Sequence, residues 1–410
     1  MGDRVILACR GRIWRYASLS GRRHRGLGAT MRSLGAIAGT AAVLVAAACS
    51  PASRPAVGAA TLLPGPVATL RGPASTTGAP EPSASPGAAT AAGRVTITAV
   101  GDTMLGNTPD LPPDPAGYFD AVKSTLDSGA QIVFGNLEGT LTTSTASKCG
   151  ASKGAGLTCF AFRNPPDYAQ YLKQAGFTML NDANNHSFDF GSAGQAQTVQ
   201  AIHAAGLAQT GLPGEITTVT ANGVKVAVLG FAPYAYDASL LDVPGARALI
   251  KQASQQAQIV VVYMHAGAEG AGADHVTGQE EIYLGEDRGN AEAFAHMAID
   301  AGASLVIASG PHVLRGMQFY KGHLICYSLG NFAGYGNFAT GGDRAMSAIL
   351  RVTLSSAGQF TSARVYPVQL SSQGRPTPGG GAIAFVAGLS SADFSSSAAR
   401  ILSTGVIKAP

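Results

Sequence analysis

The stretch VTITAVGDTMLG, residues 95 to 106, decides the fold expected for this chain. Val95 to Val100 is a short apolar run rich in β-branched residues, which is typical of a buried strand. The run ends at Gly101-Asp102, so a carboxylate directly follows the strand. Open α/β folds bind ligands at the carboxyl ends of their strands, but an aspartate there is also a common helix or turn cap. This stretch alone leaves both interpretations open.

Outward from this strand, apolar runs alternate with helical stretches and predict an α/β fold. Strands are expected at 131–134, 177–180, 224–231, 259–264 and 305–308, and helices at 116–126, 165–174, 193–205, 246–257 and 291–301. After Gly310, consecutive strands at 315–320, 323–328, 345–353 and 363–370 indicate an antiparallel half. Two sheets flanked by helices predict a four-layer α-β-β-α sandwich over residues 94–370. The Ser-, Gly- and Pro-rich residues 371–410 are expected to be a low-complexity C-terminal tail.

Residues 1 to 48 have the pattern of a signal peptide. Arg32 precedes an uncharged run from Leu34 to Ala48, and small residues stand directly before Cys49, as in a bacterial lipobox. A transmembrane anchor is the alternative, but about 15 apolar residues are short for a bilayer that needs roughly 20. Whether translation starts at Met1 or at Met31, we expect the leader to be removed and Cys49 to be lipidated. The protein is then extracytoplasmic and anchored to the outer face of the cell membrane.

The segment 49–93 is expected to be a disordered tether, because it carries eight of the 22 prolines among Ala, Ser, Thr and Gly. The leader holds eight of the 28 Lys and Arg but one of the 24 Asp and Glu. Its removal therefore changes the formal net charge from +4 to about −3. A negative chain gives no reason to expect a nucleic-acid partner.

Cysteine usage predicts one disulfide. With Cys49 lipidated, Cys149 and Cys159 are expected to pair in an oxidising compartment and to close a Gly-rich loop. Cys326 lies in an apolar, strand-like run and is expected to be a buried free thiol.

Five polar clusters follow expected strands, and each offers residues that commonly bind metals. They are Gly101-Asp102, Asn136-Leu137-Glu138, Asn184-Asn185-His186, His265 with Glu269, and His312. Any one of them has a structural explanation, such as a helix cap or a packed histidine. Together their carboxylates, amides and imidazoles suit a divalent metal such as Mn, Fe, Zn or Mg.

The same clusters lie in five blocks, AVGDTMLG, FGNLEGTL, NDANNHSFDFG, YMHAGAEG and SGPHVLRGMQFYKGHLICYSLGNF. In this order they resemble the signature blocks of the CapA capsule-synthesis family, also described as poly-γ-glutamate synthesis proteins. The resemblance covers roughly 94–370 and implies a calcineurin-like metallophosphoesterase architecture that holds one or two metal ions.

The resemblance also implies roles for individual residues. The metal ligands are then Asp102, Glu138 as the bridging carboxylate, Asn185, His265 and His312. His186 is implied to be a general acid beside the leaving group, and Asp189 either orients its ring or caps the following helix.

Four further residues are expected to contact the substrate, namely Asn136, Glu269, Arg163 and Asn331. The substrate is an anionic cell-surface polymer or a phosphoester. A solvated arginine at Arg163 and a turn fixed by Asn331 remain the alternatives.

Two positions depart from the family pattern. Ser309-Gly310-Pro311-His312 lacks one of the two histidines that relatives carry, and the first block lacks the Asp-x-His of phosphoesterases. We expect Ser309 to mark the missing imidazole, so that Ser309→His adds metal affinity. Two functions therefore stay open. One is a metal-dependent hydrolase of a phosphoester or γ-glutamyl polymer, and the other is a non-catalytic accessory that binds or guides a cell-surface polymer.

Overall fold

Side chains alternate between two apolar layers along the central strands. In β9 (Ile259–His265), Val261 and Tyr263 join one hydrophobic core, whereas Val262 and Met264 join another on the opposite face. Such strands are covered on both sides. The computed structural model describes residues 93–150 and 159–410; the leader, the lipidated Cys49 and the tether expected before them lie outside the described residues.

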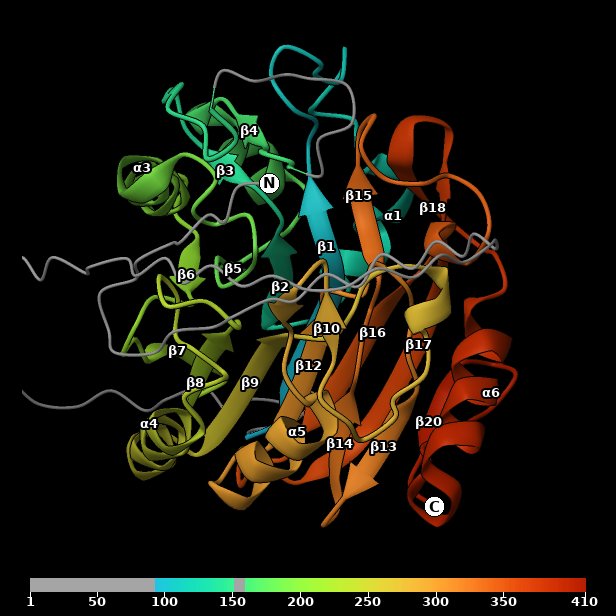
Figure 1. Cartoon of the computed structure of the whole chain (residues 1–410). Helices are drawn as coiled ribbons and strands as arrows, with labels where there is room; N and C mark the ends of the chain where they lie inside the picture. The colour runs from blue at the N-terminus through green and yellow to red at the C-terminus, as the bar shows by residue number, and fades with distance from the viewer. Residues whose placement is uncertain (1–92, 151–158) are drawn as a thin grey trace, which may run out of the picture. The chain divides into compact units, whose positions relative to one another are not determined.

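The first sheet has ten strands in the order β19-β20-β17-β16-β1-β2-β5-β6, with β15 paired to β1 and β18 paired to β17 (Figure 1). Strands β15, β1, β2, β5 and β6 are parallel, and β16 to β20 add an antiparallel part. The bounds are β1 (Val95–Met104), β2 (Ile132–Leu137), β5 (Met179–Asn181), β6 (Ala208–Thr210), β15 (Asn331–Gly334), β16 (Met346–Leu354), β17 (Phe360–Ser371), β18 (Arg375–Pro378), β19 (Arg400–Ile401) and β20 (Val406–Lys408).

The second sheet has six strands in the order β13-β14-β12-β9-β8-β7. Its four central strands are parallel, and an antiparallel strand closes each edge. The bounds are β7 (Thr217–Ala221), β8 (Val224–Phe231), β12 (Leu305–Ser309), β13 (Met317–Tyr320) and β14 (His323–Cys326). Two short ribbons lie apart from both sheets, β3 (Thr140–Leu141) with β4 (Arg163–Asn164) and β10 (Ile282–Tyr283) with β11 (Glu286–Asp287).

Helices cover the outer faces of both sheets, so the architecture is the expected four-layer α-β-β-α sandwich. The first sheet packs on α1 (Asp120–Asp127), α2 (Ala169–Gln174) and α3 (Gly191–Ala204), and the second on α4 (Val243–Gln256) and α5 (Ala291–Asp300). Short 3-10 turns are η1 (Pro166–Tyr168), η2 (Ala271–Ala273), η3 (Asp343–Ala345), η4 (Ser372–Gly374) and η5 (Ser395–Ser397). The side chains of Asp242 and Asn290 cap α4 and α5 by accepting backbone N–H groups.

A β-bulge in β1 sets the direction of Asp102. Ala99 pairs with Phe134 and Asp102 with Asn136, so one extra residue of β1 lies between these pairs. Ala99 faces the core between the sheets and Val100 the opposite face. If the side chains of β1 alternated strictly, Asp102 would lie on the side of Val100, but the bulge places it on the side of Ala99 and next to Asn136.

Two expectations about the C-terminal half are wrong. The strands after Gly310 are not one antiparallel unit, because β14 is parallel to β12 and β15 is parallel to β1. Residues 371–410 are not a tail without structure, because they form β18, α6 (Ala382–Phe394), β19 and β20. In α6, small residues separate the large apolar ones that pack into the core, which hid the helix in a Ser- and Gly-rich sequence.

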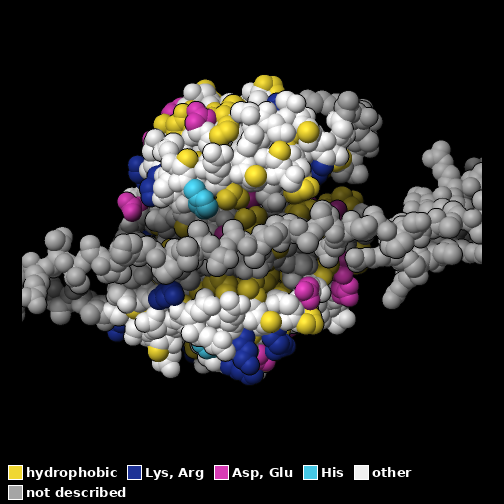
Figure 2. Space-filling view, turned by 90° about the vertical axis from the view of Figure 1, so that its left-hand side faces the viewer, with side chains coloured by type: hydrophobic (Ala, Val, Ile, Leu, Met, Phe, Trp, Pro, Cys, Tyr) yellow, Lys and Arg dark blue, Asp and Glu magenta, His cyan; other side chains and the backbone are white. Residues whose placement is uncertain are grey.

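Among the described residues, no helix combines the length and apolar character needed to cross a bilayer. On the face shown in Figure 2, acidic and basic side chains are few and interspersed, apart from a small group of basic ones at the lower edge.

Candidate metal centre

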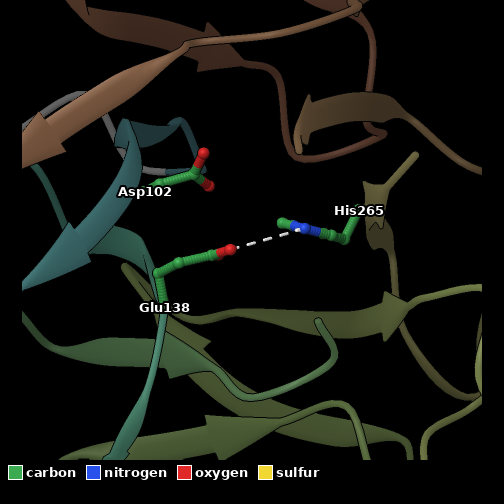
Figure 3. Close-up of side chains that lie close together, drawn as sticks. All are labelled: Asp102, Glu138 and His265. Atoms are coloured by element: carbon green, nitrogen blue, oxygen red, sulfur yellow. Dashed lines mark ion pairs between the residues drawn. The ribbon is translucent and has the colours of Figure 1, made fainter. Parts of the chain in front are cut away.

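Asp102, Glu138 and His265 meet where strands of the two sheets end. Asp102 lies in β1, Glu138 directly follows β2, and His265 ends β9. All three are fully buried, and one potential ligand atom of each lies within 4.8 Å of the other two. Figure 3 shows the His265 ring facing the two carboxylates from the opposite side.

One polar atom of each of these three residues has no hydrogen-bond partner in the protein. Glu138 Oε1 and His265 Nε2 are buried without a hydrogen bond and lie 3.7 Å apart. Asp102 Oδ2 likewise has no hydrogen bond, although His312 Nδ1 lies 3.1 Å away. Leaving buried polar atoms unpaired costs about 1–3 kcal/mol each. Two carboxylate oxygens and an imidazole nitrogen are ligands that suit a divalent cation, so these residues fit a metal site.

Burial sets the protonation of the group. It raises the pKa of Glu138 well above its usual value, with the charge of Asp102 adding to the effect. Burial also lowers the pKa of His265 to about 3, so this ring is neutral at physiological pH, as a metal ligand must be. For Asp102, burial is outweighed by the contacts with His312, and the pKa is lowered.

His312 borders the group on its more open side. Its Nδ1 hydrogen-bonds to Asn331 Oδ1 (2.8 Å), and its Nε2 lies 3.7 Å from Glu269 Oε2. Burial alone lowers the pKa of His312, but Asp102, Glu138 and Glu269 together raise it to about 10. The ring is therefore positively charged at physiological pH in the metal-free protein, and it would have to lose a proton in order to bind a metal ion.

Asn136 orients the two carboxylates. Its Nδ2 donates to Asp102 Oδ1 (2.9 Å) and to Glu138 Oε2, while its Oδ1 accepts from Asn181 Nδ2 (2.7 Å) and Asn184 Nδ2 (3.1 Å). Every polar atom of the Asn136 amide thus has a protein partner, and two of these partners are the carboxylates of Asp102 and Glu138.

The three consecutive residues Asn184, Asn185 and His186 have different contacts. Asn184 accepts the backbone N–H of His186 (2.9 Å) and fixes the loop. Asn185 Oδ1 is buried and has no partner, which leaves it free to bind a cation. His186 Nδ1 lies 2.8 Å from Asp189 Oδ2, and the ring packs on Phe162 with centroids 4.5 Å apart. Of the two interpretations of Asp189, the geometry supports ring orientation.

Three residues expected to contact substrate have protein partners in this structure. Arg163 Nη1 donates to the carbonyl oxygen of Ser144 (2.6 Å), and Asn331 holds His312. Glu269 pairs with Arg288 Nη2 (2.9 Å).

Arg315 is fully buried and forms a bidentate pair with Glu281. Cys149 and Cys159 form a disulfide with Cα atoms 5.7 Å apart, and Cys326 is a buried free thiol.

Ser309 is not at an open ligand position. It is fully buried, its hydroxyl donates to Asp102 Oδ1, and it also contacts the hydroxyl of Tyr263. Replacing Ser309 by histidine would remove both hydroxyl contacts, and the gain in metal affinity expected from Ser309→His stays a prediction. A side chain at Gly310 would point toward His265, because a Cβ there would lie 3.3 Å from its Cδ2.

Tyr263 was missed in the sequence, although its spacing gave a signal. It lies two residues before His265 on the same strand and therefore on the same face. Its importance depends on contacts with β12 that the sequence of β9 does not contain.

Fold and site together define an α-β-β-α sandwich protein with a buried Asp-Glu-His centre that fits a divalent metal. The model of the bacterial capsule synthesis protein family, PGA_cap, matches residues 96–335, and the chain belongs to this family. It is 35% identical over 182 residues to the capsule biosynthesis protein CapA of Bacillus anthracis and 32% identical over 178 residues to the PGA biosynthesis protein CapA of Bacillus subtilis. Each match covers 39% of this chain, and 41% and 43% of the respective relative, so the chain spans about two fifths of the length of these relatives.

Among solved structures, a 5'-nucleotidase precursor from Thermus thermophilus is similar with a TM-score of 0.39 and 13% sequence identity. The alignment covers 67% of this chain and 54% of that one.

Proposed function

We propose that this capsule-synthesis family member is a metal-dependent hydrolase that acts on a phosphoester or on a γ-glutamyl polymer. The observation that carries the proposal is the set of unpartnered ligand atoms on Asp102, Glu138 and His265. A protein that needed these residues only for its fold would pair them. A bound divalent ion would polarise the substrate and lower the pKa of a water molecule.

His186 is the residue proposed to move a proton. Asp189 accepts a hydrogen bond from its Nδ1, so when the ring carries two protons the other one, on Nε2, is left to be donated to a leaving group. Lys148 Nζ lies 2.7 Å from Asp189 Oδ1 and balances that buried charge. Phe162 covers one side of the ring and limits the access of water to it.

The cellular location is part of the same proposal. A leader that ends before Cys49 supports an extracytoplasmic protein held at the membrane by a lipid, and the Cys149–Cys159 disulfide is consistent with an oxidising compartment. An anionic surface polymer or a phosphoester would then meet the metal centre outside the cytoplasm.

The test compares metal content with turnover. Protein purified without the leader is loaded with Mn²⁺ or Zn²⁺, analysed for metal, and assayed against phosphoesters and γ-glutamyl polymers. We expect Glu138→Gln to lose both metal and activity, and His186→Gln to keep metal but lose at least about 100-fold in kcat. His296→Gln is the matched control, because His296 bonds to Gln318 and belongs to no part of the centre.

Wild-type protein that binds no divalent metal would overturn the proposal. Stoichiometric metal together with polymer binding but no turnover would support the non-catalytic accessory instead.

A further inference from the structure

A chain of hydrogen bonds links two of the metal-site residues through hydroxyl groups. Tyr263 Oη lies 3.2 Å from His265 Nδ1 and contacts Ser309 Oγ, which donates to Asp102 Oδ1. All four side chains are fully buried. The chain is built into the strand register, because Ser309 of β12 pairs directly with His265 of β9.

Counting protons fixes the direction of every bond in this chain. A hydroxyl has one proton to donate. The proton of Ser309 goes to Asp102, so Ser309 must accept the proton of Tyr263. Tyr263 then has none left for His265 and can only accept, which requires a proton on His265 Nδ1.

The opposite direction is excluded by the same count. If Tyr263 donated to His265, two hydroxyl oxygens would face each other at hydrogen-bond distance with no proton between them. A neutral imidazole protonated on Nδ1 has its lone pair on Nε2, the atom that faces Glu138 without a partner.

We propose that Tyr263 and Ser309 are positioning residues that fix the Nδ1–H tautomer of His265 and so direct its Nε2 lone pair toward Asp102 and Glu138. This inference rests on the proposed metal-dependent function. The same two hydroxyls couple His265 in the second sheet to Asp102 in the first, so they hold ligands from both sheets in register.

The first experiment measures the tautomer directly in the metal-free protein. The ¹⁵N shifts and proton couplings of the His265 ring, assigned by loss of its signals in His265→Gln, distinguish Nδ1–H from Nε2–H. We expect Nδ1–H in the wild type and a mixture or a switch to Nε2–H in Ser309→Ala, where the proton of Tyr263 becomes free to turn to His265. An Nε2–H ring in the wild type would overturn the inference whatever the variants do.

The second experiment measures Mn²⁺ and Zn²⁺ dissociation constants by calorimetry. Tyr263→Phe and Ser309→Ala should each weaken binding 10–100-fold, and Ser309→Thr, which keeps the hydroxyl, should recover most of the affinity. Tyr327→Phe is the matched control, because Tyr327 is also fully buried and its hydroxyl bonds to Gln318 (2.8 Å), outside the centre.

The outcomes separate this inference from the proposed function. Wild-type protein that binds no metal would reject the function but leave the tautomer measurement valid. Tight binding in the wild type and in folded Tyr263→Phe and Ser309→Ala alike would reject the positioning role alone. If Tyr263→Phe does not fold, Ser309→Ala and the wild-type tautomer decide.

Discussion

His312 has a left-handed backbone conformation, with φ of 58°, although it is not a glycine. This conformation costs an L-residue about 1–2 kcal/mol, so the surrounding contacts must hold it. Its ring nitrogens face Asn331, Asp102 and Glu269. The loop thus places the positively charged ring of His312 among carboxylates in the metal-free protein.

The charge of His312 should make the stability of the metal-free protein fall at alkaline pH. Its pKa is raised to about 10 from an unfolded value near 6.5. The contribution is therefore fully present below about pH 6.5 and is lost as the pH rises through 10. From pH 7 to 10 we expect the free energy of unfolding to fall by about 3 kcal/mol more in the wild type than in His312→Asn, measured by urea denaturation with a chelator present. Asparagine tolerates the left-handed backbone, and equal pH profiles for the two proteins would contradict the assignment.

Gly101 is required by the close approach of another strand end. A Cβ at this position would lie 1.8 Å from the carbonyl oxygen of Gly330, the same oxygen that accepts the backbone N–H of Asp102 (2.9 Å). A methyl group would push Asp102 away from Glu138 and His265.

Gly101→Ala should therefore lose about 3 kcal/mol of unfolding free energy and bind metal more weakly. Gly388→Ala is the control, because Gly388 lies in α6 with no atom within 4 Å of the added Cβ. That change should be neutral or stabilise by up to about 1 kcal/mol. Thermal denaturation and metal titration of both variants measure the effects, and a Gly101→Ala protein as stable as the wild type would refute the steric argument.

At the scale of elements, the Cys149–Cys159 disulfide joins two segments that hold the proposed general acid. Next to Cys149, Lys148 contacts Asp189 through its side chain (2.7 Å) and its backbone N–H (2.8 Å). Three residues after Cys159, the N–H of Phe162 donates to Asp189 Oδ2 (2.6 Å). The disulfide therefore holds together the two segments that contact the His186–Asp189 pair.

Replacing both cysteines by serine should lower stability by about 2–3 kcal/mol, because a short loop is no longer closed in the unfolded chain. We also expect kcat to fall several-fold with bound metal unchanged, since the metal ligands lie outside this loop. Urea denaturation, kinetics and metal analysis test these points. Thiol reduction of the wild type should reproduce the kinetic effect, whereas Cys326→Ser, which removes a sulfur outside the disulfide, should not change kcat. A fall in metal content equal to the fall in kcat would argue against a separate role for the loop.

The loop between β9 and α5 is anchored by Arg315, which is fully buried. Its guanidinium donates to both carboxylate oxygens of Glu281 (2.8 and 2.7 Å) and to the carbonyl of Ala273 (2.7 Å). Because this loop also carries Glu269 and Arg288, the anchor fixes one border of the metal centre.

Glu281→Gln should destabilise the protein by about 3–5 kcal/mol, because it leaves the Arg315 charge buried without a counter-charge. Asp300→Asn, which breaks the exposed Asp300–Lys321 pair, should have little effect. Chemical denaturation compares the two, and similar small losses in both would show that the Arg315 pair does not anchor the loop.

At the scale of the whole molecule, the sequence predicted the layers better than the strand order. Long apolar runs such as 224–231 and 259–264 identified central strands because each is buried on both faces. The pairing of β14 with β12, by contrast, depends on long-range contacts that no local pattern carries. The order of the motifs correctly predicted that Asp102, Glu138 and His265 lie close together. The protein partners of Asn136, Arg163 and Glu269 could not be predicted in this way, because they depend on side-chain packing.

The C-terminal residues complete the core between the two sheets. Ala382 and Val386 of α6 and Ile407 of β20 belong to the same buried cluster as β1 and β9, and Phe394 packs under the second sheet. The strand β20 also pairs with β17 at the edge of the first sheet. These contacts make the segment part of the folded domain, although its composition suggested a tail.

Deleting residues 379–410 should therefore abolish cooperative folding. The deletion exposes the apolar side of β16 and β17 and leaves β17 without its pairing partner β20. The removed side chains are each worth about 1.5–3 kcal/mol when buried, so the loss exceeds the 5–15 kcal/mol stability of a typical domain once several are gone. Calorimetry should show no unfolding transition, and the protein should bind a hydrophobic dye. Deleting only the exposed Ala409 and Pro410 is the control and should leave the melting temperature unchanged. A 379–410 deletion that melts cooperatively near the wild-type temperature would restore the view of this segment as a tail.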